Sequence, residues 1–444
     1  MLSDLITAIA TAPGRGALAV VRVSGQGAFE AVRRLLGWAD SLPVVPRQAI
    51  LATFHESDGT PFDRGLVTFF PAPASYTGED VVELSCHGGA LVPAQLLAAL
   101  QALGARLAWP GEFTRRAVQN GKLDLLQAEA VGDLIDATTR AQGRGALRQL
   151  DGGLSRRLDE LRYELLELTA LLSYEIDFPE EDDGPISPET IRAGLESSRG
   201  AVSALLRTAP VGERVRRGAL VVLAGRPNAG KSSLFNALLG IDRALVTEIP
   251  GTTRDAIEAE LDLDGWPVRL ADTAGLRDAT DRIERLGIEV SQRYLAAADL
   301  TILCVEAGAR LTDEEHAMVR ERATVLVRTK SDLGAVGDDG GLPVSAVTGD
   351  GLPLLATTLV DRLFGEVEQF ADVEPLLTRE RHRLALERAE AALVDAEPHI
   401  GARGDAVLAA HHVRRAITAL DELIGAVDVE DVLGAIFERF CVGK

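Results

Sequence analysis

The chain has 444 residues, 46% of them hydrophobic, and this length suggests about three domains rather than one. No apolar run reaches the ~18 residues that a membrane span needs, no basic-then-apolar segment begins the chain, and its three cysteines (Cys86, Cys304 and Cys441) are scattered, so we expect a cytoplasmic protein without a disulfide framework. The formal net charge of −21 disfavours broad, unaided binding of nucleic acid, which normally requires a basic face.

The first part of the chain, residues 1–118, mixes short strands such as 17–23 with an apolar helix at 91–103 and predicts an α+β domain. Helical periodicity dominates the next part, residues 119–215. Leucines recur three and four residues apart between positions 154 and 172, and packing in a helical bundle explains them better than a functional coiled coil. The acidic run 177–183 should break this helix as a solvated bend.

A phosphate-binding motif follows. Residues 225–232 read Gly-Arg-Pro-Asn-Ala-Gly-Lys-Ser and match the spacing G-x-x-x-x-G-K-[ST], between an apolar strand at 219–224 and a helix at 233–239. Such a loop points backbone N–H groups at a triphosphate, while Lys231 adds a positive charge and Ser232 a hydroxyl for Mg2+. A Gly-rich turn that merely joins strand to helix is the weaker interpretation.

Three further motifs favour guanine over adenine. Asp272-Thr273-Ala274-Gly275 ends a strand, where an aspartate holds Mg2+ and a glycine amide senses the γ-phosphate. Thr329-Lys330-Ser331-Asp332 ends another strand, and its carboxylate can accept two hydrogen bonds from guanine. Ser345-Ala346 suits the loop over the base. Most GTPases carry asparagine at the position of Thr329, whose hydroxyl should preserve the base pocket, with weaker bracing of the loop.

The residue that orients the attacking water is not evident from these motifs. Ras-like proteins place a glutamine after the D-x-x-G segment, where this chain has Leu276. Asn228, with backbone oxygens from 247–255, is a candidate ligand for a monovalent cation. Two alternatives remain open at this point: Asn228 only caps the loop, or Arg254 acts as an arginine finger.

The remaining residues, 369–444, predict a second helical segment with apolar residues 413, 417, 420 and 424 on one face. The simplest packing joins both helical segments in one bundle, with residues 216–368 inserted between them. The expected fold is therefore multidomain: an N-terminal α+β domain, an α-helical bundle, and an inserted Ras-like α/β P-loop GTPase domain.

Longer runs of the sequence resemble the MnmE (TrmE) family of tRNA-modification GTPases. The runs that carry the resemblance are 225–239, 244–255 and 272–277, with 12–16, 22–25, 76–80, 110–113, 122–125, 430–434 and 441–444 towards the two ends. The resemblance covers nearly the whole chain.

This resemblance implies a potassium-activated GTPase whose G domains dimerise, so that the protein is a homodimer. It assigns K+ to Asn228, Thr247, Ile249 and Thr252, and Mg2+ to Ser232 and Thr253. It gives Glu284 the role of orienting water, beside Lys231 and Asp272 as catalytic residues. The nucleotide-site residues that the motifs and the resemblance together indicate are Asn228, Ala229, Gly230, Lys231, Ser232, Ser233, Thr247, Glu248, Ile249, Pro250, Gly251, Thr252, Thr253, Asp272, Thr273, Ala274, Gly275, Thr329, Lys330, Asp332, Ser345 and Ala346.

The resemblance also makes residues 1–118 a tetrahydrofolate-binding domain, with contacts from Arg22, Glu83, Lys122 and Lys444. Without it, each of these would read as a surface charge or a salt bridge. Cys441 is a candidate nucleophile, with a packing role as the favoured alternative.

The activity that the resemblance implies is installation of an aminomethyl or carboxymethylaminomethyl group at C5 of the wobble uridine of tRNA. It requires a one-carbon unit from 5-formyl- or methylene-tetrahydrofolate and an FAD-dependent partner, MnmG (GidA), which we expect to hold most of the tRNA. Two alternatives are a non-enzymatic GTP switch of the ribosome-assembly type and a metabolic one-carbon enzyme that GTP merely regulates.

Overall fold

The computed structural model describes residues 4–39, 45–56, 58–177, 187–241, 258–272, 292–321, 323–334, 340–367, 375–401, 404–425 and 443. The chain divides into two compact units, one of Met1–Gly132 with Asp421–Lys444 and one of Asp133–Leu420. No helix among the described residues has the length and apolar character needed to cross a membrane.

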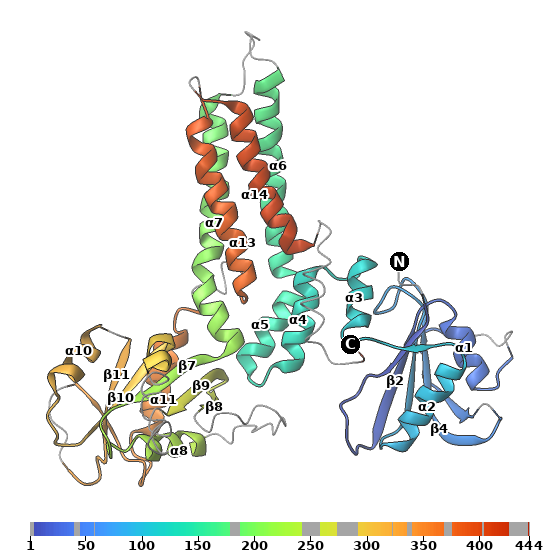
Figure 1. The fold of residues 1–444 in the computed structure, drawn as a ribbon, viewed down its shortest axis with the longest axis horizontal. Helices are drawn as coiled ribbons and strands as arrows, with labels where there is room; N and C mark the ends of the chain where they lie inside the picture. The colour runs from blue at the N-terminus through green and yellow to red at the C-terminus, as the bar shows by residue number, and fades with distance from the viewer. Residues whose placement is uncertain are drawn as a thin grey trace, which may run out of the picture. The chain divides into compact units, whose positions relative to one another are not determined.

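The first unit contains a six-stranded sheet in the order β3-β4-β5-β2-β1-β6 (Figure 1). Neighbouring strands are antiparallel except β1 and β6, which are parallel. The strands are β1 (Ile6–Ile9), β2 (Leu18–Ser24), β3 (Ile50–His55), β4 (Pro61–Phe70), β5 (Val81–His87) and β6 (Arg106–Leu107), and the helices are α1 (Ala28–Leu35), α2 (Leu91–Ala102), α3 (Glu112–Gln119) and α4 (Leu125–Asp136), the last of which extends past the end of the unit.

The two faces of this sheet differ because side chains alternate along a strand. On β2, Val21 and Val23 are buried in a core that includes residues of α1 and α2. The opposite face carries Arg22 and Ser24, and Phe113 of α3 packs on that side with Ile6. The predicted strand and helix therefore form an α+β domain, and one sheet face presents polar residues.

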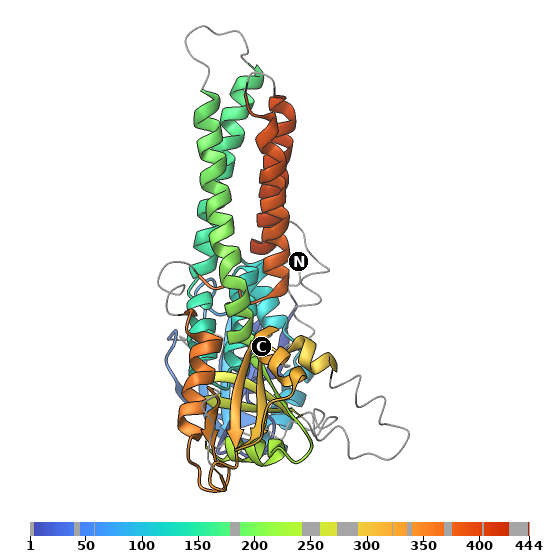
Figure 2. The same ribbon diagram turned by 90° about the vertical axis from the view of Figure 1, so that its left-hand side faces the viewer.

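The second unit begins with long helices. These are α5 (Arg140–Leu150), α6 (Gly153–Asp177), α7 (Pro188–Arg217), α13 (Glu380–Ala396) and α14 (Ala406–Ile424), with a short 3-10 helix at Glu397–His399. Figure 2 shows α6, α7 and α13, coloured teal-green, green and orange-red, side by side, and α7 contacts both of the others. The predicted leucines of α6 are all buried, which confirms bundle packing. Most of the acidic run 177–183 lies outside the described residues.

The rest of this unit is an α/β domain with a second six-stranded sheet, in the order β12-β11-β10-β7-β9-β8. The strands are parallel except β8, which is antiparallel to β9. Its elements are β7 (Ala219–Ala224), α8 (Lys231–Ile241), β8 (Glu258–Leu263), β9 (Trp266–Asp272), β10 (Leu300–Glu306), α10 (Asp313–Glu321), β11 (Thr324–Thr329), β12 (Leu342–Val344) and α11 (Leu352–Phe364). This is the predicted Ras-like α/β domain, inserted between two helical segments.

The chain enters and leaves this domain beside the same helix. α7 leads into β7, and the segment that follows the domain returns along α7, where the Leu377 N–H donates to Thr208 Oγ1 at 3.0 Å. Gly212 of α7 allows close approach, because a Cβ there would lie 2.1 Å from the Leu377 oxygen. The predicted boundaries at 118, 215 and 368 stay predictions, and the second of them falls within α7.

Candidate functional site

The phosphate-binding motif forms a loop between the fully buried strand β7 and the start of α8. Gly225 has φ 138°, and a Cβ there would lie 2.3 Å from the Cys304 oxygen of β10, so this position requires glycine. Gly230 and Asn228 also have positive φ, 82° and 62°. These angles give the loop the tight curl that its sequence predicts.

Lys231 folds back over this loop. Its Nζ donates to the carbonyl oxygens of Gly225 at 2.9 Å and of Arg226 at 2.8 Å, and the residue is largely buried. The ammonium group therefore lies beside the backbone of the loop, and not in solvent. A cation and a helix N-terminus that share one loop form an anion site of the kind that binds phosphates.

Ser232 and Asp272 come from different elements and meet at this loop. Ser232 lies in the first turn of α8 and donates from Oγ to Asp272 Oδ2 at 2.7 Å, where Asp272 ends β9. They meet because the carboxyl ends of the parallel strands β7 and β9 share one edge of the sheet. Hydroxyl and carboxylate oxygens are suitable ligands for Mg2+.

The predicted base-side residues gather at the ends of β11 and β12. Thr329 donates from Oγ1 to the Ala229 carbonyl at 2.7 Å and is buried. Ser345 donates from Oγ to Asp332 Oδ1 at 2.6 Å, which fixes that carboxylate. Lys330 has φ 56°, and its Nζ lies 3.1 Å from Glu306 Oε2. The hydroxyl of Thr329 thus contacts the phosphate-binding loop, and bracing weaker than that of an asparagine stays a prediction.

An ion pair that the sequence motifs did not reveal anchors the outside of the loop. Arg226 donates from Nε to Glu315 Oε1 at 2.9 Å and from Nη2 to the Arg310 carbonyl at 2.8 Å. Glu315 also accepts from the Thr312 N–H at 2.8 Å, while Thr312 Oγ1 accepts from the Glu315 N–H at 3.2 Å. Burial opposes ionisation of Glu315, but the hydrogen bond from Arg226 and that backbone bond outweigh it and lower its pKa. The T-x-x-E spacing of a helix-capping box was the available signal.

Several predicted residues lie outside the described part of the chain. They are Thr247, Glu248, Ile249, Pro250, Gly251, Thr252, Thr253, Arg254, Thr273, Ala274, Gly275, Leu276, Glu284, Cys441 and Lys444.

The N-terminal set begins with an ion pair on the polar face of the first sheet. Arg22 of β2 donates from Nε and Nη2 to Oε1 of Glu83, its neighbour on β5, at 3.1 and 2.8 Å. The Arg22 guanidinium lies 5.3 Å from the ring centroid of Tyr76 and 5.6 Å from that of Phe113. Lys122 lies near this region, because its stem packs on the loop at Gly78. A paired charge over two aromatic rings suits a planar ligand with charged groups.

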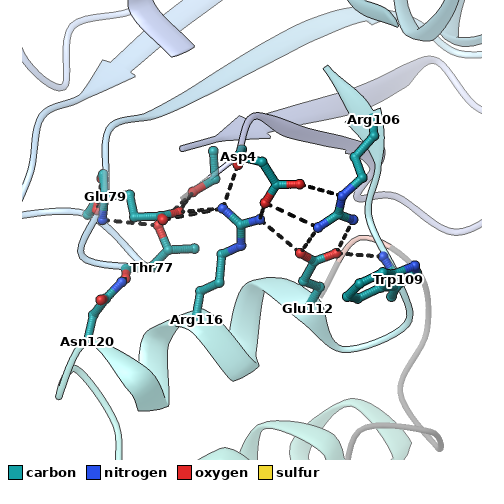
Figure 3. Close-up of polar contacts among 10 residues, drawn as sticks. Asp4, Thr77, Glu79, Arg106, Trp109, Glu112, Arg116 and Asn120 are labelled. Carbon is teal, nitrogen blue, oxygen red and sulfur yellow. Dashed lines mark hydrogen bonds and ion pairs between the residues drawn. The ribbon is translucent and has the colours of Figure 1, made fainter. Parts of the chain in front are cut away.

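A partly buried charge network lies beside this face, and the sequence analysis did not predict it (Figure 3). Arg116 and Glu112 of α3 are both about fully buried, 1% exposed, and their side chains bond each other at 2.9 Å. Asp4, Glu79 and Arg106 complete the network. The hydrogen bonds and charges of the arginines lower the pKa of Asp4 and, against the effect of burial, that of Glu112.

Comparison with known proteins covers the chain from end to end. The family model for the GTP-binding protein TrmE N-terminus matches residues 5–122, and that for the MnmE helical domain matches residues 125–441. Three curated proteins are each named tRNA modification GTPase MnmE. The protein of Azoarcus sp. (strain BH72) is 45% identical over 99% of this chain and 98% of its own length. The protein of Akkermansia muciniphila is 41% identical over 99% of this chain and 98% of its own length. The protein of Phenylobacterium zucineum (strain HLK1) is 45% identical over 100% of both chains. Similarity at this level and coverage shows that the chain belongs to the MnmE family of tRNA modification GTPases and is a P-loop GTP hydrolase that acts in tRNA modification.

Proposed function

We propose that this chain is a potassium-activated GTPase that modifies C5 of the wobble uridine of tRNA together with an FAD-dependent partner of the MnmG (GidA) kind. The modification installs an aminomethyl or carboxymethylaminomethyl group with a one-carbon unit from 5-formyl- or methylene-tetrahydrofolate. The observation that carries the GTPase part of the proposal is the contact of Ser232 with Asp272 beside the phosphate-binding loop. Membership of a tRNA-modifying family favours this function over a ribosome-assembly switch.

Guanine specificity in this proposal depends on Asp332. Its carboxylate is oriented by the Ser345 hydroxyl at 2.6 Å, and Ser345 itself accepts from the N–H groups of residues 347 and 348. A carboxylate fixed in this way can accept two hydrogen bonds from guanine, whereas adenine would leave it unpaired. Ala346 follows in the same loop and closes over the base.

The residues present fit the two proposed cations. Ser232 and Asp272, with Thr253, offer the oxygen ligands that Mg2+ prefers. Asn228 offers a side-chain oxygen for K+ from a loop position with left-handed backbone, and Thr247, Ile249 and Thr252 would complete that site. When bound, the two cations neutralise charge that develops on the transferred phosphoryl group. Lys231 contacts the phosphates, and Glu284 orients water.

The folate proposal rests on the polar face of the first sheet. Arg22 pairs there with Glu83, and the Arg22 guanidinium lies over the rings of Tyr76 and Phe113. Arginine and lysine can bind the glutamate tail of a folate, and a carboxylate can accept from the N–H edge of the pterin. Lys122 and Lys444 supply the further cations, and Gly443, directly before Lys444, lies against the backbone of β1.

The net charge of the chain bears on how tRNA is bound. A net charge of −21 works against binding of tRNA by this chain alone, so the FAD-dependent partner holds most of the tRNA. The chain itself acts as a homodimer in the cytoplasm.

The central experiment measures GTP turnover in matched K+ and Na+ buffers. We expect the wild-type rate to be several-fold higher in K+, and Asn228→Gly, which keeps the left-handed backbone without the side-chain oxygen, to lose that difference while still binding GDP. Asp272→Ala should abolish turnover with the fold intact. Equal wild-type rates in both salts would contradict potassium activation, and equal rates together with loss of turnover in Arg254→Ala would favour an arginine finger instead.

Reconstitution tests the modification itself. The chain, the FAD-dependent partner, 5-formyl- or methylene-tetrahydrofolate, GTP and tRNA are combined, and the nucleosides of the tRNA are analysed by mass spectrometry. Omission of any one component should abolish the C5 product. Product formation without GTP, or folate turnover without tRNA, would support a metabolic one-carbon enzyme and overturn the proposal.

A further inference from the structure

The partly buried network of Figure 3 contains two arginines with different contacts. Arg116 donates from Nη2 to Asp4 Oδ1 at 2.7 Å and to Glu112 Oε1 at 2.9 Å, and from Nη1 to Glu79 Oε2 at 3.2 Å. Arg106 bonds Asp4 and Glu112 as well, the latter at 2.6 and 2.8 Å. Among the ion pairs of the described residues, only Arg116 reaches Glu79.

Glu79 belongs to the loop 76–80, the last part of the connection 71–80 between β4 and β5, and this loop borders the proposed folate site. Ser24 of β2 donates from Oγ to Glu79 Oε2 at 2.8 Å and contacts the Thr77 hydroxyl at 2.8 Å. Ser24 lies two residues beyond Arg22, on the same face of the strand. The carboxylate of Glu79 therefore links the loop to β2 through Ser24, and Arg116 of α3 donates to the same carboxylate.

The same loop touches both described cations of the proposed site. The ring of Tyr76 lies under the guanidinium of Arg22 at 5.3 Å, and Gly78 leaves room for the stem of Lys122, whose Cγ would be 3.2 Å from a Cβ at that position. Asn120 donates to the Thr77 carbonyl at 2.7 Å and links the loop to the end of α3. A shift of the loop would therefore move the supports of Arg22 and Lys122 together.

We propose that Arg116 is a positioning residue for the folate site: through Glu79 it holds the loop 76–80 in the conformation that aligns Arg22 and Lys122. This inference rests on the proposed folate function. Arg116 is buried and contacts no ligand in this proposal. It affects the affinity for folate only by holding the carboxylate of Glu79.

Removal of this contact should have a local effect. Asp4 and Glu112 keep their hydrogen bonds to Arg106 when Arg116 is changed, so the network loses its link to the loop and not its whole charge balance. Charge-assisted hydrogen bonds are about twice as strong as neutral ones, and the loss of one corresponds to about a tenfold change in an equilibrium constant.

The test compares four variants of the full chain: Glu79→Gln, Arg116→Lys, the double variant, and Arg106→Lys as the matched control. The control breaks bonds to Asp4 and Glu112 but leaves Glu79 with Arg116. Affinity for 5-formyl-tetrahydrofolate is measured by isothermal titration calorimetry, with thermal unfolding and GTP turnover recorded for each protein.

We expect Glu79→Gln and Arg116→Lys each to weaken 5-formyl-tetrahydrofolate binding about tenfold, and the double variant to be no weaker, because both changes remove the contact between Arg116 and Glu79. Arg106→Lys should lower the melting temperature and leave folate affinity within about twofold. GTP turnover should not change.

Affinity that follows melting temperature across all variants, or wild-type affinity in Glu79→Gln, would overturn the positioning role. If Arg116→Lys does not fold, the comparison of Glu79→Gln with Arg106→Lys decides the question by itself. Failure of the wild-type chain to bind 5-formyl-tetrahydrofolate would instead refute the folate proposal on which this role rests.

Discussion

Thr329 provides a direct test of how the base-binding side supports the phosphate-binding loop. Its hydroxyl donates to the Ala229 carbonyl at 2.7 Å, and Thr329 is only 4% exposed. Thr329→Val keeps nearly the same shape and removes the hydroxyl. The Ala229 carbonyl then loses a buried donor, which costs about 1–3 kcal/mol when no other group replaces it.

The structure limits how much of this cost reaches nucleotide affinity. The loop is also held at Gly225 by its close approach to β10 and at Arg226 by Glu315, so the loss of one bond should loosen the loop without collapsing it. We expect GDP to bind Thr329→Val about five- to tenfold more weakly, corresponding to about 1–1.4 kcal/mol. The rest of the cost should lower thermal stability.

The assay is titration with a fluorescent GDP analogue, together with thermal unfolding. Thr329→Ser is the matched control, because it keeps the hydroxyl and loses only a methyl group, and Thr329→Asn tests the residue that most GTPases carry. If Thr329→Val binds GDP as tightly as Thr329→Ser and unfolds at the same temperature, the hydrogen bond to Ala229 does not brace the loop and the reasoning is wrong.

Three further predictions concern packing and ionisation. Gly212→Ala should lower the melting temperature, because steric overlap with a backbone carbonyl costs about 1–3 kcal/mol and exceeds the gain of about 1 kcal/mol in helix propensity. Gly200→Ala, in open space on the same helix, should raise the melting temperature. Equal shifts in the two variants would contradict the close contact at Gly212. The folded pKa of Glu112 is lowered, so this carboxylate stabilises the fold above its unfolded pKa, and the stabilisation is lost on acidification. Below about pH 5, the melting temperature of Glu112→Gln should therefore fall less than that of wild type. Parallel pH profiles of the two proteins would refute this. Burial raises the pKa of Cys86 to about 11 and of Cys304 to about 12, so both thiols should resist a thiol reagent at neutral pH, as mass spectrometry of the native chain can check; rapid labelling of either would be the opposite result.

The nucleotide site could be predicted from the sequence because its parts are local motifs at the ends of strands. A parallel sheet brings those ends together, so the contact of Ser232 with Asp272 follows once β7 and β9 are recognised as neighbours. The support of the loop by Arg226 and Glu315 was missed, because Arg226 occupies a position of the motif that any residue can fill, Glu315 lies outside the nucleotide motifs, and the two are 89 positions apart.

The N-terminal site shows the opposite case. Asp4, Glu79 and Arg116 are separated by 37 to 112 positions, and a single sequence offers no reason to bring these charges together. Arg22 and Glu83 were expected to be surface charges or a salt bridge without the family resemblance, and they do pair. The sequence predicted a strand at 17–23, but not that Arg116 and Glu112 would be buried beside one face of its sheet, since that depends on the path of the loop 76–80.

The insertion of the GTPase domain depends on residues that appear ordinary in the sequence. Thr208 and Gly212 lie within a long helix, although threonine and glycine have low helix propensity. Thr208 accepts the Leu377 N–H, and Gly212 lets that backbone approach closely, so the returning segment is held where the outgoing helix ends. One helix thus fixes both connections of the inserted domain. The leucines of α6 predicted the bundle because their spacing is regular, whereas the contact of α7 with the returning segment depends on two single residues that follow no such pattern.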